Sequence, residues 1–172
     1  MEEERAFDRP ALDSLLRRVG LDPGQTHAVS GDLPKFDPFR DPAATDLLGR
    51  ELARRVRALD VNAVCVWEEP EDLVLGHVLG LALNVRWARC VNADGLVALI
   101  GDLPPAARCV IATDAVRATE PIAAMRNLVQ VHGGDVVAIA ALLATPELDG
   151  FREGTVASVT LAGLDHDASP GA

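Results

Sequence analysis

The feature that most constrains this fold is a set of strand-length stretches that are mostly apolar and lack strict polar alternation. They occupy residues 61–67, 85–91, 108–113 and 135–143. A strand with one face in water alternates apolar with polar side chains, whereas a strand of a parallel sheet is covered on both faces. Predicted helices at 71–83 and 120–132 lie between these stretches. The sequence therefore predicts an α/β fold, with an open, mostly parallel, Rossmann-like sheet between two layers of helices.

The first sixty residues follow a different pattern. A short helix is expected within residues 1–20, since Pro10 suits a first helical turn and Gly20 suits a helix end. Residues 21–41 are rich in Gly, Pro and Asp, which predicts a loop or a short hairpin. A further helix is expected to begin after Asp41, a good N-cap that is followed by a proline.

We expect one domain over residues 1–164, because a chain of 172 residues suits a single globule. In this domain, residues 1–41 form an N-terminal helix and a hood-like segment, and residues 42–164 form the core. A last strand is predicted at 155–161. Residues 165–172 are polar and are expected to be a flexible tail.

Charge narrows the classes of partner. The chain has a net charge of −10, and residues 61–172 carry six basic against fourteen acidic side chains. A negative surface repels nucleic acid and anionic lipid, so we expect neither nucleic acid nor a membrane as a partner. The longest apolar run, residues 136–144, has nine residues, whereas a membrane span needs about twenty.

The compartment is predicted from the N-terminus and the cysteines. The chain starts Met-Glu-Glu-Glu-Arg without an apolar segment, which indicates no signal peptide. Cys65, Cys90 and Cys109 are odd in number, widely spaced and set in apolar stretches. This pattern is typical of free, buried thiols, and it favours neither a disulfide framework nor a zinc site. The predicted location is cytoplasmic.

Ligands of open parallel sheets bind beyond the carboxyl ends of the strands, where loops lead into helices. Three loops are predicted at such places, at residues 67–72, 91–103 and 113–121. In the first, Trp67 could line an apolar pocket or simply pack in the core. The acids that follow, beginning with Glu68 and Glu69, could hold Mg²⁺ or a cationic ligand, or form a solvated loop at a helix N-terminus.

The order of segments is informative. Ser30-Gly31 and Lys35-Phe36-Asp37 precede a helix, a strand, a loop and another helix, and a later strand ends in an acid with a helix behind it. Over roughly residues 25–145 this layout resembles the type I phosphoribosyltransferases, the orotate phosphoribosyltransferase branch above all. The resemblance implies a phosphoribosyltransferase-like fold, with a homodimer as the usual assembly.

In that family, four apolar residues, two acids, two small residues and a glycine-rich turn bind phosphoribosyl pyrophosphate. The acids hold the ribose hydroxyls, and backbone N–H groups of the turn hold the 5′-phosphate at a helix N-terminus. Residues 109–121 of this chain read CVIATDAVRATEP. The candidate ligand-binding residues that this match indicates are Thr113 and Asp114 at the acid positions and Arg117, Ala118, Thr119 and Glu120 in the turn, together with Trp67, Glu68 and Glu69 in the first loop.

The departures from the family pattern all weaken the binding of phosphate. The turn has no glycine, Glu120 brings a negative charge, and Pro121 has no N–H to donate. Residues 67–72 include four acids and no glycine, and residues 92–102 carry no basic side chain. Arg117 is the one residue of the turn that could offset these changes.

We therefore predict a phosphoribosyltransferase-like protein with a degenerate phosphoribosyl pyrophosphate motif, acting as a non-catalytic, ligand-sensing or regulatory subunit without a cofactor or a metal site. The alternative is a divergent, active phosphoribosyltransferase for orotate or another nucleobase, which uses phosphoribosyl pyrophosphate and Mg²⁺. It would place Asp114 on the ribose and Arg117, Arg86 or Arg89 on phosphate. In a third hypothesis, a paralogous partner subunit supplies the missing groups.

Overall fold

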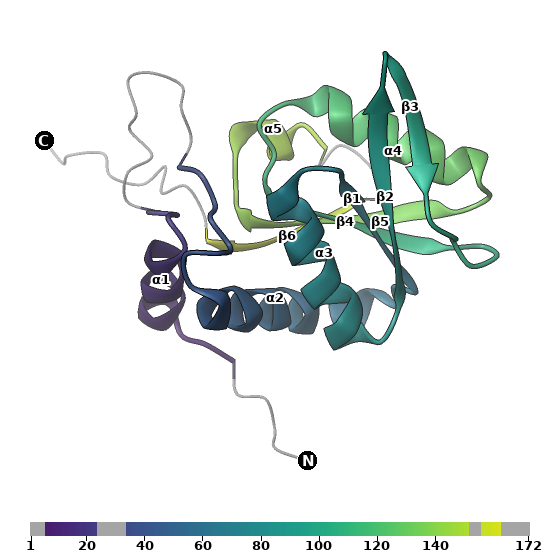
Figure 1. Cartoon of the computed structure of the whole chain (residues 1–172). Helices are drawn as coiled ribbons and strands as arrows, with labels where there is room; N and C mark the ends of the chain where they lie inside the picture. Colours follow the sequence, from purple (N-terminus) through teal and green to yellow (C-terminus); the bar gives the residue numbers. More distant parts are fainter. Residues whose placement is uncertain (1–5, 24–33, 152–155, 163–172) are drawn as a thin grey trace, which may run out of the picture.

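The computed structural model describes residues 6–23, 34–151 and 156–162. Within them, a central six-stranded sheet has the order β3-β2-β1-β4-β5-β6 (Figure 1). The strands are β1 (Ala63–Trp67), β2 (Arg86–Ala93), β3 (Leu96–Ile100), β4 (Arg108–Ala115), β5 (Asp135–Leu143) and β6 (Ala157–Ala162). Neighbouring strands are parallel except for β2 and β3. The predicted α/β class with an open, mostly parallel sheet is confirmed.

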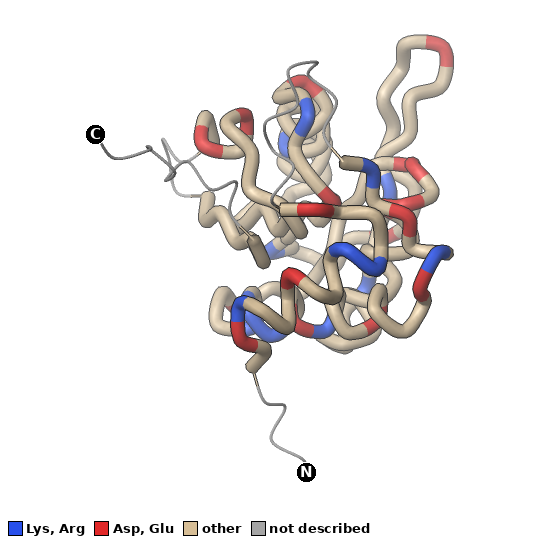
Figure 2. The backbone as a smooth tube through the Cα atoms, turned by 90° about the vertical axis from the view of Figure 1, so that its left-hand side faces the viewer, with Lys and Arg blue, Asp and Glu red and all other residues tan. Residues whose placement is uncertain are grey.

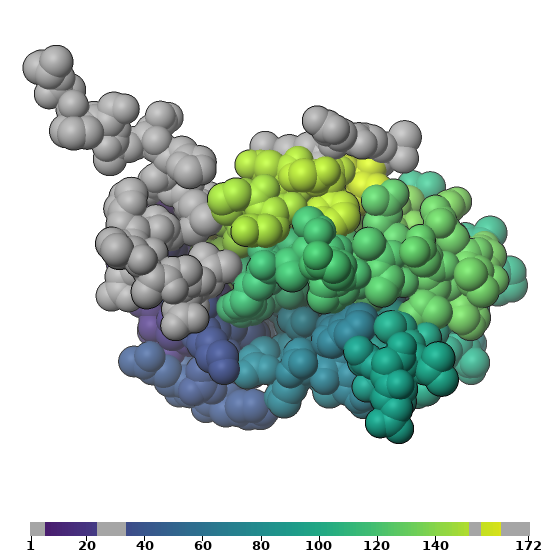
Figure 3. All heavy atoms as spheres, turned by 90° about the horizontal axis from the view of Figure 1, so that it is seen from above, coloured from purple at the N-terminus to yellow at the C-terminus, as the bar shows by residue number. Residues whose placement is uncertain are grey.

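Helices cover both faces of this sheet. One face carries α1 (Arg9–Arg18), α2 (Pro42–Val56) with the short 3₁₀ turn η1 (Arg57–Leu59), and α3 (Pro70–Leu83). The other face, which Figure 3 shows, carries α4 (Thr119–Val131) and the short α5 (Pro146–Asp149). Successive side chains of a strand point to opposite faces. Val64 and Val66 of β1 therefore pack in the first layer, and Cys65 packs in the second.

The first two helices begin at the capping signals in the sequence. Oδ1 of Asp41 accepts a hydrogen bond from the N–H of Ala44 at 3.0 Å, and Pro42 opens α2 as predicted. Asp8 caps α1 in the same way, since its Oδ1 accepts from the N–H of Ala11 at 3.0 Å. Each cap satisfies a backbone donor that the first helical turn leaves unpaired.

A glycine sets the position of α3 on the sheet. A Cβ atom at Gly76 would lie 2.5 Å from Cγ1 of Val66 in β1, which is too close for any side chain. The absence of a side chain lets α3 lie directly on β1. The first turn of α3 is thereby held at the carboxyl end of β1, beside β4.

The prediction for residues 91–103 is wrong, because they do not form a loop that leads into a helix. β2 turns at Asp94 and Gly95 and returns as the antiparallel strand β3. Both turn residues have positive φ, 52° and 84°, which matches the twist of a two-residue hairpin. The hairpin projects from the body of the molecule, and Asp94 at its tip is the one charged residue between positions 91 and 100 (Figure 2).

The region after β5 adds one element that the sequence did not suggest. Thr145 caps the short helix α5, and its hydroxyl donates to the carbonyl oxygen of Val116 at 2.7 Å. The strand predicted at 155–161 is β6, which pairs in parallel with β5. Ser30-Gly31 of the hood-like segment and the tail at 165–172 lie outside the described residues.

Two predictions from composition can be compared with the structure. Cys65, Cys90 and Cys109 are free and buried, as predicted. The sulfurs of Cys65 and Cys90 lie 3.6 Å apart across β1 and β2. In the described part of the chain, no helix is long and apolar enough to cross a bilayer.

Candidate functional site

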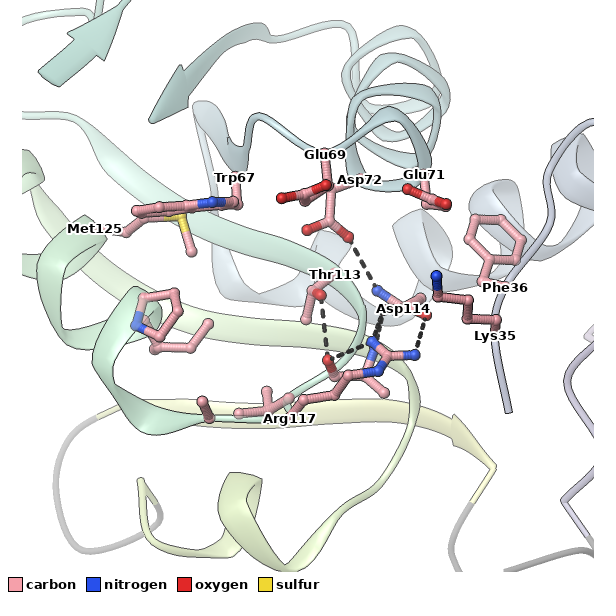
Figure 4. Close-up of a pocket in the computed structure, with 15 residues that line it drawn as sticks. Lys35, Phe36, Trp67, Glu69, Glu71, Asp72, Thr113, Asp114, Arg117 and Met125 are labelled. Carbon is pink, nitrogen blue, oxygen red and sulfur yellow. Dashed lines mark hydrogen bonds and ion pairs between the residues drawn. The ribbon is translucent and has the colours of Figure 1, made fainter. Parts of the chain in front are cut away.

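A pocket of about 350 Å³ lies at the carboxyl edge of the sheet (Figure 4). It is enclosed by the end of β1 and the start of α3, by the end of β4 and the start of α4, and by residues 35–36. Parallel strands end at the same edge of a sheet, so turns that are distant in the sequence meet there. The volume is typical of pockets that bind small organic molecules.

Asp114 is buried at the end of β4, and Arg117 neutralises it. Nη1 and Nη2 of Arg117 donate to the two carboxylate oxygens of Asp114, at 2.6 and 2.7 Å. The N–H of Ala115 donates to Oδ1 of Asp114 at 2.7 Å. The hydrogen bonds to Asp114 are the main reason why the pKa of Arg117 lies above its usual value. Because bidentate, charge-assisted contacts are strong, both oxygens of Asp114 are well satisfied inside the protein.

Arg117 also connects the β4–α4 turn with the N-terminal part of the chain. Its Nη2 donates to the carbonyl oxygen of Pro34 at 3.2 Å, and its Nη1 donates to that of Ala115 at 3.3 Å. Pro34 directly precedes Lys35 and Phe36, which line the pocket. One guanidinium group therefore positions both the end of β4 and the segment that faces it.

Asp72, in the first turn of α3, is the second buried carboxyl group of the pocket. Only 8% of the residue is exposed, and its Oδ1 accepts a hydrogen bond from the N–H of Asp114 at 3.3 Å. Burial, followed by repulsion from the Asp114 carboxylate, raises the pKa of Asp72 to about 7. In the sequence, Asp72 belongs to the acidic run that could hold Mg²⁺ or a cationic ligand, but it was not among the candidate ligand-binding residues. Its position in the acidic run before α3 was visible, but its contact with β4 was not.

Apolar side chains form another wall of the pocket. Trp67 stands at the end of β1, and Figure 4 shows the side chain of Met125, from α4, beside its indole ring. Met125 is buried, whereas Trp67 is partly exposed. Sulfur–aromatic contacts of this kind are favourable, and the accessible part of the indole is available to a ligand.

The turn from β4 into α4 contains no left-handed residue. Ala118 is extended, with φ −150° and ψ 151°, directly before the first residue of α4. Among the described residues, those other than glycine that have positive φ are in other turns, at Asp60, Asn84, Asp94 and Ala106. The chain therefore enters α4 from an extended residue at Ala118, without a left-handed turn.

Six of the nine candidate residues from the sequence line the pocket, namely Trp67, Glu69, Thr113, Asp114, Arg117 and Ala118. Glu68, Thr119 and Glu120 are not among its lining residues. Glu68 instead forms an ion pair with Arg89 of β2, with Oε1 and Nε 2.9 Å apart. The first loop thus directs Glu69 and Glu71 into the pocket and Glu68 away from it.

The charged groups that line the pocket are four acids, Glu69, Glu71, Asp72 and Asp114, and two bases, Lys35 and Arg117. Since Arg117 is paired with Asp114, Lys35 is the remaining base of the lining, and it faces three further carboxyl groups. Throughout the described ranges, no group of three or more His, Cys, Asp or Glu side chains is placed to hold a metal ion. The lining is therefore acidic on balance and favours positive over negative charge.

No family model and no curated protein matches this chain. Solved structures do match it. An adenine phosphoribosyltransferase from Thermoanaerobacter pseudethanolicus has a TM-score of 0.69 at 19% identity, over 88% of this chain and 99% of the other. The orotate phosphoribosyltransferase of Mycobacterium tuberculosis has a TM-score of 0.68 at 19% identity, over 93% and 90% of the two chains. For that of Aeropyrum pernix, the TM-score is 0.67 at 20% identity, over 89% and 94%.

These similarities show that the chain has the fold of the type I phosphoribosyltransferases, so the resemblance in the sequence is confirmed at the level of the fold. The adenine and orotate enzymes match about equally well. Because a fold can carry many different functions, the activity has to be argued from the site.

Proposed function

We propose that this protein is a ligand-sensing or regulatory subunit with a phosphoribosyltransferase fold, which binds a small molecule in the pocket and does not transfer phosphoribosyl groups. The observation that carries this proposal is the contact of Arg117 with Asp114. At 2.6 and 2.7 Å, it occupies both oxygens of the carboxylate at the ribose position of the motif. A ribose diol would have to compete with the guanidinium group for these two oxygens.

A neutral sugar is at a disadvantage in that competition. Hydrogen bonds to charged groups contribute about 1.5–3 kcal/mol each. The side chain of Asp114 is only 8% exposed, so water cannot readily replace a lost partner. Neutral hydroxyl groups form weaker bonds to a carboxylate than a guanidinium group does. Asp114 is therefore a poor receptor for a sugar while Arg117 stays in place.

The rest of the pocket disfavours a substrate with several phosphoryl groups. Glu69, Glu71 and Asp72 face the same space as Lys35. Two like unit charges about 5 Å apart repel each other by about 3 kcal/mol at an effective dielectric constant near 20. In addition, Pro121 at the start of α4 has no N–H that could bind a phosphate oxygen.

Isothermal titration calorimetry with phosphoribosyl pyrophosphate and Mg²⁺ tests this proposal. We expect no binding tighter than about 100 μM, in keeping with an acidic pocket whose ribose carboxylate is already paired. A tighter dissociation constant, or pyrophosphate release with any member of a panel of nucleobases, would overturn the proposal.

A divergent, active phosphoribosyltransferase is the second candidate, and one observation favours it. Lys35 and Arg117, which could contact phosphoryl oxygens, line the same pocket as Asp114. This candidate predicts Mg²⁺-dependent pyrophosphate release that Asp114→Asn abolishes and that the surface change Asp46→Asn leaves intact. The absence of release across the panel of nucleobases would exclude it.

A regulatory subunit acts through an assembly, and we propose a homodimer or a complex with a paralogous partner subunit. Size-exclusion chromatography with light scattering on protein purified from its native source distinguishes these assemblies. The homodimer predicts twice the mass of the chain, and the second assembly predicts a co-purifying protein of similar size. A monomer without a co-purifying protein would contradict both.

A further inference from the structure

We propose that the ligand of the pocket is a planar aromatic molecule that carries a positive charge and no phosphate. This inference rests on the proposed function and adds the chemical class of the ligand. Two features of the pocket, contributed by different elements, lead to it. One is the apolar wall around Trp67, and the other is a set of carboxyl groups that outnumber the basic groups facing them.

The apolar wall is suited to a flat ring. Trp67 and Met125 lie beside each other (Figure 4), and Pro121 and Ile122 of α4 also line the pocket. Tryptophan stacks on planar ligands, and it is the aromatic side chain that attracts cations most strongly. A wall of this kind favours an organic cation over a bare metal ion, whose preferred ligands are oxygen atoms and water.

The carboxyl groups lie next to this wall because they follow Trp67 in the chain. Figure 4 shows the carboxylates of Glu69 and Asp72 close together on the side of the pocket adjacent to Trp67. Asp72 is 8% exposed, so water screens its charge poorly. A buried carboxylate without a matching cation is stabilised by a ligand that brings a positive charge. A phosphorylated ligand would have the opposite effect.

Because Asp72 can ionise, the preference of the pocket for a cationic ligand depends on pH. The charged groups that surround it are Asp114 and Arg117 from β4 and the following turn, Glu69 and Glu71 from the start of α3, and Lys35 from the segment opposite. Burial and the Asp114 carboxylate together raise the pKa of Asp72 to about 7. A bound cation favours the ionised form, so affinity increases as the pH rises through this range. If only the ionised form binds, the increase from pH 6 to pH 8 is about tenfold.

The test compares two probes with the same ring system in isothermal titration calorimetry on the full-length protein. N-methylquinolinium carries a permanent positive charge, and quinoline is uncharged near neutral pH. We expect the cation to bind more tightly than quinoline, and about tenfold more tightly at pH 8 than at pH 6. Quinoline should show no comparable dependence on pH. Equal affinity for both probes, or no measurable binding of the cation, would overturn the inference.

Variants separate the two features of the pocket. Asp72→Asn should remove the pH dependence of cation binding and leave the binding of quinoline unchanged. Trp67→Ala should weaken the binding of both probes at either pH. Glu69→Gln should weaken the binding of the cation at both pH values. This variant keeps the test decisive if Asp72→Asn does not fold. Glu147→Gln, an exposed change on α5 outside the pocket, is the matched control and should leave the binding of both probes unchanged. Retention of the pH dependence in Asp72→Asn would contradict the inference.

Failure of this inference can be distinguished from failure of the proposed function. Binding of phosphoribosyl pyrophosphate below about 100 μM contradicts the proposed function, whatever the probes do. If that metabolite does not bind and the cation does not bind either, the absence of phosphoribosyl transfer stands and the ligand class proposed here is wrong.

Discussion

Asp72 and Asp114 are two buried aspartates of one pocket that differ in what neutralises them. Asp114, at the end of β4, has Arg117 on both of its carboxylate oxygens. Asp72, at the start of α3, accepts an N–H from Asp114 at 3.3 Å, and its pKa is raised to about 7. Two aspartates at the same edge of the sheet therefore differ. The carboxylate of Asp114 is paired within the protein, whereas the carboxyl group of Asp72 is available to a ligand.

This difference assigns different physical roles to the two turns. The internal pair of the β4–α4 turn stabilises the folded state, because its removal would leave a buried charge without a partner. The buried carboxyl group of the β1–α3 turn lowers stability when it ionises, and in return it can attract a cation. Functional groups commonly reduce stability in this manner. Four predictions test the comparison.

The largest effect is expected from Arg117→Ala. The substitution leaves the Asp114 carboxylate buried without its cation, next to Asp72. Removal of one partner of a fully buried pair costs about 3–5 kcal/mol. Because the Arg117 side chain is 40% exposed, we expect a smaller loss of about 2 kcal/mol in the free energy of unfolding. Urea denaturation at pH 7 measures it, with Asp46→Ala in an exposed helical pair as the control. Equal losses in both variants would contradict an internal pair that stabilises the fold.

The second prediction concerns the dependence of stability on pH. The pKa of Asp72 in the folded state, about 7, lies above its ordinary value of 3.8. The folded state therefore binds more protons between these two values, and the wild-type protein loses stability as the pH rises from about 4 to about 7. Asp72→Asn removes this loss. It should match the wild type near pH 4 and exceed its free energy of unfolding at pH 8, and the difference should grow over the range in which Asp72 ionises. A stability difference that is independent of pH would show that Asp72 does not titrate in this range.

A smaller effect is expected from Thr113→Val. A hydrogen bond from Thr113 lowers the pKa of Asp72, in opposition to the effect of burial. Loss of the hydroxyl should therefore raise the pKa of Asp72 further, and it should reduce stability at pH 8 by about 0.5–1 kcal/mol. Titration of the Asp72 carboxyl carbon by NMR measures the shift. Thr160→Val on β6 serves as the control, and a pKa of Asp72 that is the same in both variants would contradict this contact.

The smallest effect is expected from Glu68→Gln, in the same turn as Glu69 but outside the pocket. The side chains of Glu68 and Arg89 are 42% and 39% exposed, and exposed ion pairs contribute about 0–1 kcal/mol. We expect a change in stability of less than about 0.5 kcal/mol and unchanged binding of N-methylquinolinium. An effect on binding equal to that of Glu69→Gln would mean that the turn acts through its total charge, and not through the carboxylate that it directs inward.

Much of the fold could be predicted because its signals are local. Apolar runs predicted the parallel strands, and Asp41 with Pro42 predicted the start of α2. The error at residues 91–103 has an identifiable cause, since Asp94-Gly95 is a strong signal for a hairpin and the segment after it is apolar enough for a strand. Reliance on strand–helix alternation obscured that signal.

The site was predictable in place but not in detail. The turns after β1 and β4 were expected to meet at the carboxyl edge, and Trp67, Glu69 and Asp114 do line one pocket there. The partner of Asp114 lies only three positions along the same turn, at Arg117. The burial of Asp72 could not be predicted, because it depends on how α3 packs against β4. The close approach at Gly76 that sets this packing is a property of two elements together.

The amino-acid sequence alone determined the class of fold and the edge of the sheet where a ligand would bind, since hydrophobic periodicity and capping residues act within short segments. Only the tertiary structure decided which charged groups are buried and which distant segments they join. Asp72 and Asp114 are 42 positions apart, and Arg117 reaches a carbonyl group 83 positions away at Pro34. Electrostatic interactions depend on separations of a few ångströms and on burial, and both arise only when the packed elements bring these side chains together.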